Sequence, residues 1–344
     1  MIKLSILIPV FNGEIGIENC LKSIKNQNLD EDEFEVIILN DGSTDNTLFV
    51  IEQQIKYFKN IFVFTEPNSG SDISRNKLIE KVRGKYIYFI DADDYLLKNA
   101  LPKLLNHAIK NDLDILAFKS EHINDYSDLE EDGGTETLEK IAEVPEILKG
   151  EDFIRKYPLF EQVIWWFITK TEFINDFNIR FSSEKGQNNS DIIFANECFV
   201  LAERIAYIDT SVHRYFQSEN SVMRCTDEKL IKKRLNNTFN VLFQFDDLIK
   251  KLKKHNSNLS PIIFEHLENR KGGHTYVVLH ELLKNKIKKE VFYNYLAQLK
   301  AKDMYPPKGD IKLNSIDIKR TSLKLMIKNE KLLFVLRYLY LKFS

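Results

Sequence analysis

The sequence is poor in cysteine and has no long apolar run. The first shortage argues against disulfide-rich and zinc-binding proteins, and the second against membrane-spanning proteins. Its cysteines, Cys20, Cys198 and Cys225, are odd in number and widely spaced, so we expect neither a disulfide framework nor a zinc site. Since no stretch of 18 apolar residues occurs, we expect no spanning helix, and the N-terminus shows no cleavage-like site of a signal peptide. We therefore expect a cytoplasmic protein.

The sequence also lacks an excess of positive charge, internal repeats and a Gly-x-Gly-x-x-Gly dinucleotide fingerprint. A net charge of −2 provides no general attraction to nucleic acid, so we expect no nucleic-acid partner. The 344 residues are 43% hydrophobic and 29% charged, which is ordinary for a soluble globular protein with enough chain for two domains.

What the first 120 residues do contain is an alternation of strand-like and helix-like segments. Apolar runs rich in β-branched and aromatic residues predict strands at 4–10, 34–40, 60–66, 85–90 and 114–120. Helical spacing of apolar residues predicts helices at 16–27, 47–58, 74–84 and 101–111. This order predicts an α/β fold with a mostly parallel central sheet flanked by helices.

Later segments have a different texture. Residues 124–144 are acidic and polar, and we interpret them as an excursion or flexible loop. A helix at 190–205 and a strand at 206–216 follow, and from residue 227 onward the pattern is helical and rich in lysine.

Three strand ends carry unusual polar residues. They read PVFNGE (9–14), NDGSTD (40–45) and DADD (91–94), and ligands bind at the carboxyl ends of strands in open parallel sheets. Asp91 and Asp93 can face one cleft with the small Ala92 between them, and such carboxylates suit Mg²⁺ or Mn²⁺. A polar turn would use the same residue types, and we expect Asp94 to cap the helix or turn that follows.

Three stretches in one order resemble the family 2 inverting glycosyltransferases of the GT-A fold. They are SILIPVFNGEIGIENCLKSIKNQ (5–27), EVIILNDGSTDNT (35–47) and EPNSGSDISRNKLIEKVRGKYIYFIDADD (66–94). The resemblance is strong over 1–120 and weaker over 160–225. It implies a catalytic domain at 1–225, with a nucleotide-sugar-binding half at 1–120, an acceptor-side half at 150–225, and a helical C-terminal region at 226–344.

The resemblance implies roles on the donor side, position by position. Pro9, Phe11 and Glu14 fall in a turn that contacts the nucleotide, and Asp41 would contact the uracil base. The segment with Asn68, Gly70, Arg75 and Asn76 would lie near the donor diphosphate. Asp91, Ala92 and Asp93 match the Asp-x-Asp signature, in which Asp93 would bind Mn²⁺ or Mg²⁺ and Asp91 the ribose or the metal shell.

The acceptor side departs further from the family pattern. Asp191 aligns with the catalytic base, but Ser190 stands where the family usually has Glu, with Glu184 and Glu197 as weaker substitutes for the base. Asp191 could instead be a first-turn residue favoured by the helix dipole, with Ser190 as the N-cap.

Three further residues have two interpretations each. His213 would bind the metal by resemblance, although a single histidine also serves structure. Of Trp165 and Trp166, we expect one to face the acceptor sugar, while tryptophan is equally ordinary in a core.

The expected function is transfer of a sugar, with inversion, from a UDP-sugar to a hydroxyl of a glycan or lipid-linked acceptor. Bacterial surface polysaccharide synthesis is the context that the resemblance implies. The alternatives are a non-catalytic relative that binds nucleotide-sugar or glycan, and a phosphatase that uses the Asp-x-Asp motif. Residues 320–344 carry six basic residues and one acidic residue, which suits a peripheral helix on anionic lipid or a helix packed on the protein.

Overall fold

The structure is a computed structural model of the chain, and it describes residues 1–126, 146–184, 189–217, 228–256, 258–285, 287–308 and 326–343. Most of the predicted excursion at 124–144 lies outside these residues, as does Cys225. The chain forms two compact units, residues 1–156 with 161–219 and residues 157–160 with 220–344. The sequence prediction had placed the boundary at 225/226 and assigned 157–160 to the first part.

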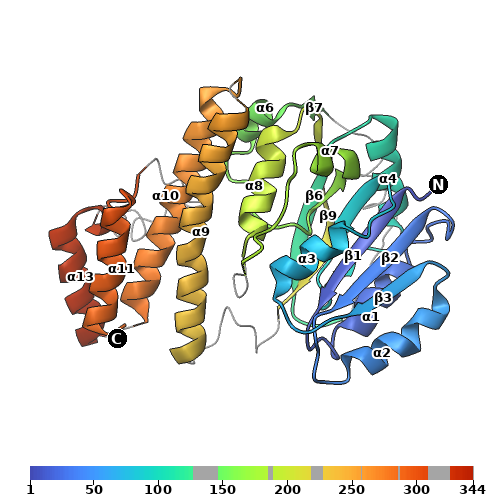
Figure 1. Cartoon of the computed structure of the whole chain (residues 1–344), viewed down its shortest axis with the longest axis horizontal. Coiled ribbons are helices and arrows are strands. Elements are labelled where there is room, and N and C mark those ends of the chain that lie inside the picture. Colours follow the sequence, from blue (N-terminus) through green and yellow to red (C-terminus); the bar gives the residue numbers. More distant parts are fainter. Residues whose placement is uncertain are drawn as a thin grey trace. The chain divides into compact units, whose positions relative to one another are not determined.

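The first unit is built on a nine-stranded sheet (Figure 1). Its strands are β1 (Leu4–Val10), β2 (Phe34–Asn40), β3 (Ile61–Thr65), β4 (Tyr86–Phe89), β5 (Tyr95–Leu96), β6 (Ile115–Ile123), β7 (Ile147–Leu148), β8 (Phe167–Lys170) and β9 (Ile205–Phe216). They lie in the order β3-β2-β1-β4-β8-β6-β9-β5, and β7 pairs with β9. The α/β class is therefore confirmed.

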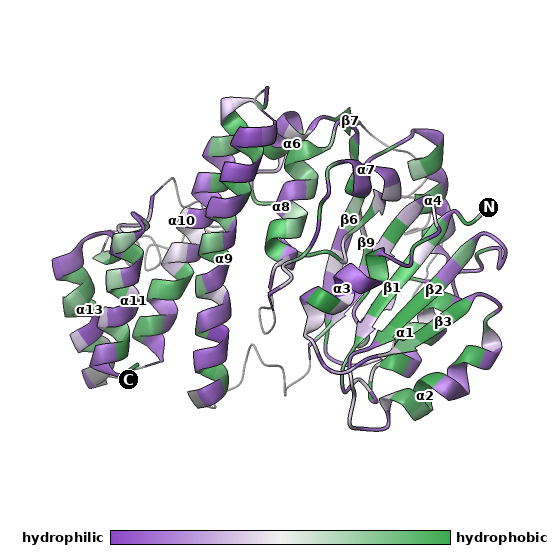
Figure 2. Cartoon of the chain, in the orientation of Figure 1, coloured by the Kyte–Doolittle hydropathy of each residue, from purple (hydrophilic) through white to green (hydrophobic). Residues whose placement is uncertain are grey.

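The sheet is parallel only in part. The parallel pairs are β1 with β2, β1 with β4, β2 with β3, and β6 with β9. β8 runs antiparallel between β4 and β6, and the two-residue strands β5 and β7 run antiparallel to β9. β1 and β2 are apolar along nearly their whole length, and Figure 2 colours the chain by this hydropathy. They are apolar because helices cover both of their faces.

Helices pack on both sides of this sheet. They are α1 (Ile17–Lys25), α2 (Thr47–Gln54), α3 (Ser71–Ile79), α4 (Ala100–Lys110), α6 (Gly150–Lys156), α7 (Thr171–Asp176) and α8 (Asp191–Leu201). Residues of α1, α2 and α4 share one hydrophobic core with alternate residues of β1, such as Ile6 and Ile8. On the other face, Phe89 of β4 contacts Phe194 of α8 edge to face. The helix predicted at 74–84 begins and ends earlier, and Gly84, which we expected to cap it, instead donates its amide to Ser5 Oγ.

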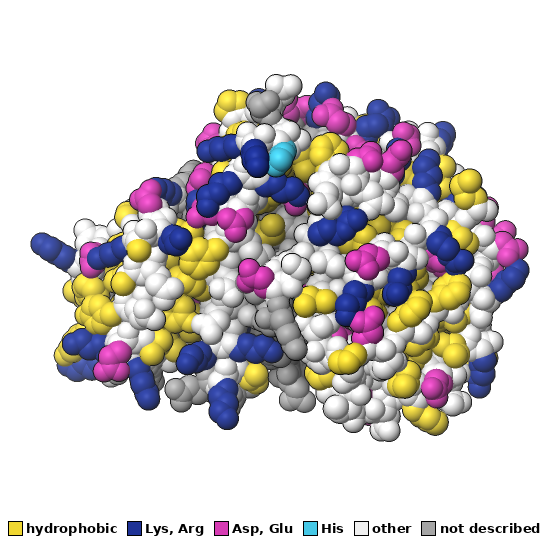
Figure 3. Space-filling model, viewed as in Figure 1, with side chains coloured by type: hydrophobic (Ala, Val, Ile, Leu, Met, Phe, Trp, Pro, Cys, Tyr) yellow, Lys and Arg dark blue, Asp and Glu magenta, His cyan; other side chains and the backbone are white. Residues whose placement is uncertain are grey.

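The second unit is helical, with α9 (Glu228–His255), α10 (Pro261–Lys284), α11 (Lys289–Ala301) and α13 (Glu330–Phe343) around its own core. α13 buries Leu333 and Leu336 in that core. Its outer face is also apolar, because Leu332, Val335, Tyr338 and Leu339 are exposed. Figure 3 shows hydrophobic side chains at the surface over α11 and α13, with lysines and arginines around them. Within the described residues, no helix is both long and apolar enough to traverse a bilayer.

Candidate active site

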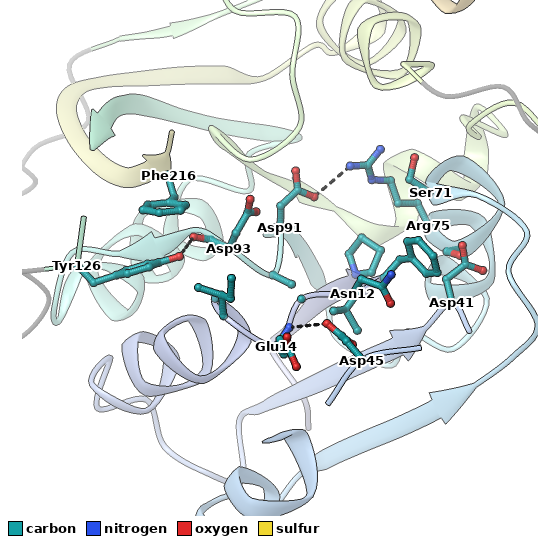
Figure 4. Close-up of a pocket in the computed structure, with 18 residues that line it drawn as sticks. Asn12, Glu14, Asp41, Asp45, Ser71, Arg75, Asp91, Asp93, Tyr126 and Phe216 are labelled. Carbon is teal, nitrogen blue, oxygen red and sulfur yellow. Dashed lines mark hydrogen bonds and ion pairs between the residues drawn. The ribbon is translucent and has the colours of Figure 1, made fainter. Parts of the chain in front are cut away.

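A pocket of about 440 Å³ lies where β1, β2 and β4 end (Figure 4). Parallel register brings Val10 opposite Asn40 and Leu7 opposite Phe89, so the turns that follow the three strands converge at one edge. The predicted site residues that line this pocket are Pro9, Phe11, Glu14, Asp41, Arg75, Asp91, Ala92 and Asp93. Those that do not line it are Asn68, Gly70, Asn76, Trp165, Trp166, Asp191 and His213.

The turns after β1 and β2 are joined by hydrogen bonds. The Asn12 amide donates to Ser43 Oγ at 2.9 Å, and the Thr44 amide donates to Asn12 Oδ1 at 2.8 Å. Glu14 Oε2 accepts from both the backbone amide and the side-chain amide of Asn46, each at 2.9 Å. We name this set the turn zipper. Glu14 therefore holds the two turns together, and sequence reasoning had assigned it only to nucleotide contact.

Asp41 is buried at the end of β2 and holds the loop that precedes α3. Its Oδ1 accepts from the Ser69 amide at 2.8 Å and its Oδ2 from the Gly70 amide at 2.9 Å. Gly70 has a φ of 97° and Gly42 a φ of 73°, a region that glycine adopts without strain. Asn68 is exposed beside this loop. Gly70, which the resemblance placed near the diphosphate, thus shapes the loop over Asp41.

Asp91 and Asp93 lie side by side on the turn after β4. Asp91 Oδ1 accepts from Arg75 Nη2 at 3.1 Å, whereas no side chain of the described residues donates to the carboxylate of Asp93. Desolvation by the surrounding protein, together with the charges of Asp94 and Asp91, raises the pKa of Asp93 to about 7. The turn rests on α1, where a Cβ at Gly16 would meet Asp93 Cα at 2.5 Å.

The prediction that Asp94 caps the next helix or turn is wrong. Asp94 is fully buried, its Oδ1 accepts from the Phe216 amide at 2.9 Å, and its Oδ2 lies 3.1 Å from His213 Nε2. The pKa of Asp94 is raised by burial and by the charge of Asp91. Asp94 therefore ties the acidic turn to β9.

His213 lies inside the protein with both ring nitrogens engaged. Its Nδ1 is 2.8 Å from Ser120 Oγ, and its Nε2 is the atom that contacts Asp94. Burial lowers the pKa of His213 to about 3, so the ring is neutral at physiological pH. A cation could therefore bind His213 only if Ser120 or Asp94 released one of the nitrogens, and we do not propose His213 as a metal ligand.

Arg75 connects α3 to the acidic turn. It is 6% exposed, and besides Asp91 its Nη1 lies 3.6 Å from Asp72 Oδ1. Burial raises the pKa of Asp72, and the positive charge of Arg75 limits this rise. Asp72 did not stand out in the sequence, because an acidic residue in a first helical turn is ordinary.

Asp191 is the first residue of α8 and is partly exposed. Desolvation by surrounding atoms raises its pKa to about 6; Arg75 opposes the rise, whereas Asp72 and Asp91 add to it. Ser190 occupies the N-cap position, but its side chain does not cap the helix, and its Oγ accepts from the Ser182 amide at 3.0 Å.

The aromatic residues of the pocket are not the two tryptophans. Trp166 is 3% exposed and stacks on Phe199 in the core, and half-buried Trp165 stacks on Tyr215 at 5.2 Å. Besides Phe11, the lining contains Tyr126 and Phe216, whose rings stack at 4.6 Å opposite Asp41 in Figure 4. Each lies at or near the end of a strand, but no motif marks it.

The site fits a divalent cation only together with a ligand. In the part of the chain that the structure describes, no three His, Cys, Asp or Glu side chains form a metal site. Asp91 and Asp93 supply carboxylate oxygens at the pocket, and Mg²⁺ or Mn²⁺ commonly takes one or two carboxylates plus substrate phosphates. The donor set therefore suits a cation that a diphosphate completes.

Comparisons with known proteins find relatives of this chain. The family model described as "Glycosyl transferase family 2" matches residues 5–178. The uncharacterized glycosyltransferase YibD of Escherichia coli (strain K12) is 26% identical over 260 residues, which cover 74% of this chain and 72% of YibD. The poly(ribitol-phosphate) beta-glucosyltransferase of Bacillus spizizenii is 38% identical over 124 residues, which cover 36% of this chain and 20% of that protein.

A solved structure shows the same fold. The crystal structure of S. aureus TarS 1-349 in complex with UDP-GlcNAc superposes with a TM-score of 0.54 at 20% identity. The superposition covers 89% of this chain and 93% of that one.

Proposed function

The chain belongs to glycosyl transferase family 2 and has the GT-A fold, and on this premise we propose that it transfers a sugar from a UDP-sugar to a hydroxyl acceptor with inversion. One observation carries the proposal: Asp41, Arg75, Asp91 and Asp93 line a single pocket. The phosphatase alternative is not carried further, because the family match covers the segment that holds the Asp-x-Asp motif.

The nucleoside end of the donor would lie against Asp41 and Phe11. Phe11 is 51% exposed at the pocket, so its ring face is free to stack on a base. Asp41 Oδ2 accepts one hydrogen bond from described residues, and a carboxylate oxygen has a second lone pair for a base N–H. TarS, whose fold is similar, was solved with UDP-GlcNAc, which supports uridine as the base.

The cation would be held by Asp93, with Asp91 at its side. A Mn²⁺ or Mg²⁺ ion held there would supply positive charge to offset the charge that develops on the departing diphosphate. Arg75, held beside Asp91, adds a fixed positive charge to the same end of the pocket.

The chemical step would be a single displacement with Asp191 as general base. The acceptor hydroxyl oxygen forms a bond to the anomeric carbon while the bond from that carbon to the diphosphate oxygen breaks. The hydroxyl proton goes to Asp191, and the nucleoside diphosphate leaves with the bonding electrons. A pKa of about 6 leaves Asp191 mostly ionised at pH 7 yet basic enough to take the proton.

The acceptor would be a glycan or lipid-linked polymer of the bacterial surface. The Bacillus spizizenii relative is named for a poly(ribitol-phosphate) acceptor and a β-linked product, which supports a hydroxyl-bearing polymer as the acceptor, and a β-linked product from an α-linked donor would mean inversion. We also propose that residues 320–344 meet the cytoplasmic face of a membrane, because α13 exposes an apolar face in a segment of net charge +5. Sedimentation with anionic vesicles tests this, and equal pelleting of a Val335→Asp/Leu339→Asp variant, which changes only exposed side chains of α13, would contradict it.

A donor screen tests the proposed function. We expect UDP-glucose or UDP-N-acetylglucosamine to raise the melting temperature in the presence of Mn²⁺, and GDP-mannose to do so less. UDP release should be lost in Asp93→Ala and Asp191→Asn and retained in Asp209→Asn, which removes an exposed carboxylate outside the pocket. Binding without any hydrolysis or transfer would favour the non-catalytic relative instead, and full activity in Asp191→Asn would reject the assigned base.

A further inference from the structure

Asp72, in the first turn of α3, is a fully buried carboxylate that the proposed mechanism does not use. Its Oδ2 accepts the Ser190 amide at 3.2 Å. Its Oδ1 has no hydrogen-bond partner among the described residues and lies 3.6 Å from Arg75 Nη1. The Ser190 side chain and the charge of Arg75 also stabilise the carboxylate, so the contacts of Asp72 all lead to Ser190 and Arg75.

The two contacts of Asp72 lead to different parts of the site. Ser190 directly precedes Asp191, so the bond to its amide fixes the start of α8 where the proposed base is carried. Arg75 extends its other terminal nitrogen to Asp91. Because a guanidinium is planar and rigid, an anchor on Nη1 also sets the direction of Nη2. Asp72 thus stands between the base and the acidic turn.

We propose that Asp72 is a positioning residue, which holds the start of α8 and the Arg75 guanidinium in the geometry that transfer needs. The residue before the base is a serine, and the negative charge beside that position comes from α3 instead. The inference rests on the proposed role of Asp191. Misplacement of a reacting group by about 1 Å can lower a rate by about 100-fold, which sets the scale of the effect.

Glu35 offers a matched control for the loss of a buried charge. It is also fully buried, and its carboxylate accepts from Arg83 Nε at 2.7 Å and from Ser5 Oγ at 2.6 Å. It does not line the pocket. Asp72→Asn and Glu35→Gln therefore each replace a fully buried carboxylate by its amide, one beside the proposed base and one away from the pocket.

The experiment compares these two variants in UDP release from UDP-N-acetylglucosamine with Mn²⁺. We expect both to lower the melting temperature, but only Asp72→Asn to reduce kcat, by about 10- to 100-fold, with UDP affinity changed less than about threefold. A double variant, Asp72→Ser with Ser190→Glu, should recover part of the kcat that Asp72→Ser alone loses. Wild-type kcat in folded Asp72→Asn would overturn the inference, and if that variant does not fold, absence of recovery in the double variant would do so.

Hydrogen exchange separates this inference from the proposed function. Asp72→Asn should lower the protection of amides at the start of α8, and Glu35→Gln should not. If the wild type releases no UDP from any donor, the proposed function fails, and unchanged protection in Asp72→Asn then rejects the role of Asp72 independently.

Discussion

Replacing Arg75 by methionine should destabilise the first unit in a way that depends on pH. Arg75 is 6% exposed and lies beside fully buried Asp72, so the small contribution of a surface ion pair does not apply. Removing one member of a buried pair costs about 3–5 kcal/mol, because the remaining charge loses its compensation. At pH 8 we therefore expect Arg75→Met to lower the free energy of unfolding by about 3–5 kcal/mol.

The sign of the pH dependence follows from Asp72. Burial already raises its pKa, and Arg75 is the charge that opposes the rise, so the variant's folded state has a still higher pKa there. Between the unfolded pKa of about 3.9 and that raised value, the folded chain binds more protons than the unfolded chain. The variant therefore gains stability as the pH falls, by up to about 1.4 kcal/mol per pH unit, so its loss relative to the wild type should be smaller at pH 5.5 than at pH 8.

Urea unfolding followed by tryptophan fluorescence measures the free energy of unfolding of the first structural unit. The chain has two tryptophans, Trp165 and Trp166, and both belong to the first unit. Arg75→Lys is the matched control, because it keeps the charge but cannot bridge two carboxylates, so its loss should be smaller and vary less with pH. A loss in Arg75→Met that is equal at pH 8 and pH 5.5 would refute the reasoning.

Three further predictions follow from the site. The kcat for UDP release should fall as the pH drops through about 6, because Asp191 becomes protonated, and a pH–rate profile flat to pH 5 would contradict this. Gly16→Ala should weaken UDP binding in calorimetry by more than about tenfold, since the new Cβ would displace the backbone of Asp93, whereas Gly273→Ala, with no atom within 4 Å, should leave binding unchanged. His213→Gln should cost about 1–3 kcal/mol in urea unfolding but leave the Mn²⁺ dependence intact, and a raised Mn²⁺ requirement would return the histidine to the metal site.

The strands and the strand-end turns could be predicted because their signals are local. The bounds 4–10 and 34–40 match β1 and β2, since a strand covered on both faces reads as an unbroken apolar run. Parallel register then brings their carboxyl ends together without further information. The two-residue strands β5 and β7 were missed because two residues show no periodicity.

The partners of the buried charges could not be predicted, because they come from distant segments. Asp94 looked like a cap, yet its partner His213 lies 119 residues away on β9. Asp72 has its partner amide at Ser190, which is 118 residues away. The aromatic pair Tyr126 and Phe216 likewise forms only when β6 and β9 pair. Such contacts depend on sheet topology, which the spacing of residues along the chain does not encode.

Because of the turn zipper, the two ends of the pocket differ in rigidity and in charge compensation before any ligand binds. Around Asn12 and Glu14 the polar groups already have protein partners, so the nucleoside end is rigid in advance and binding there loses little chain entropy. At the other end, the carboxylates of Asp91 and Asp93 repel each other, and a bound cation would offset their charge. We therefore expect an order of arrival in which the nucleotide is recognised first and the cation enters with the diphosphate. Stopped-flow mixing in which prior equilibration with Mn²⁺ speeds UDP binding would contradict that order.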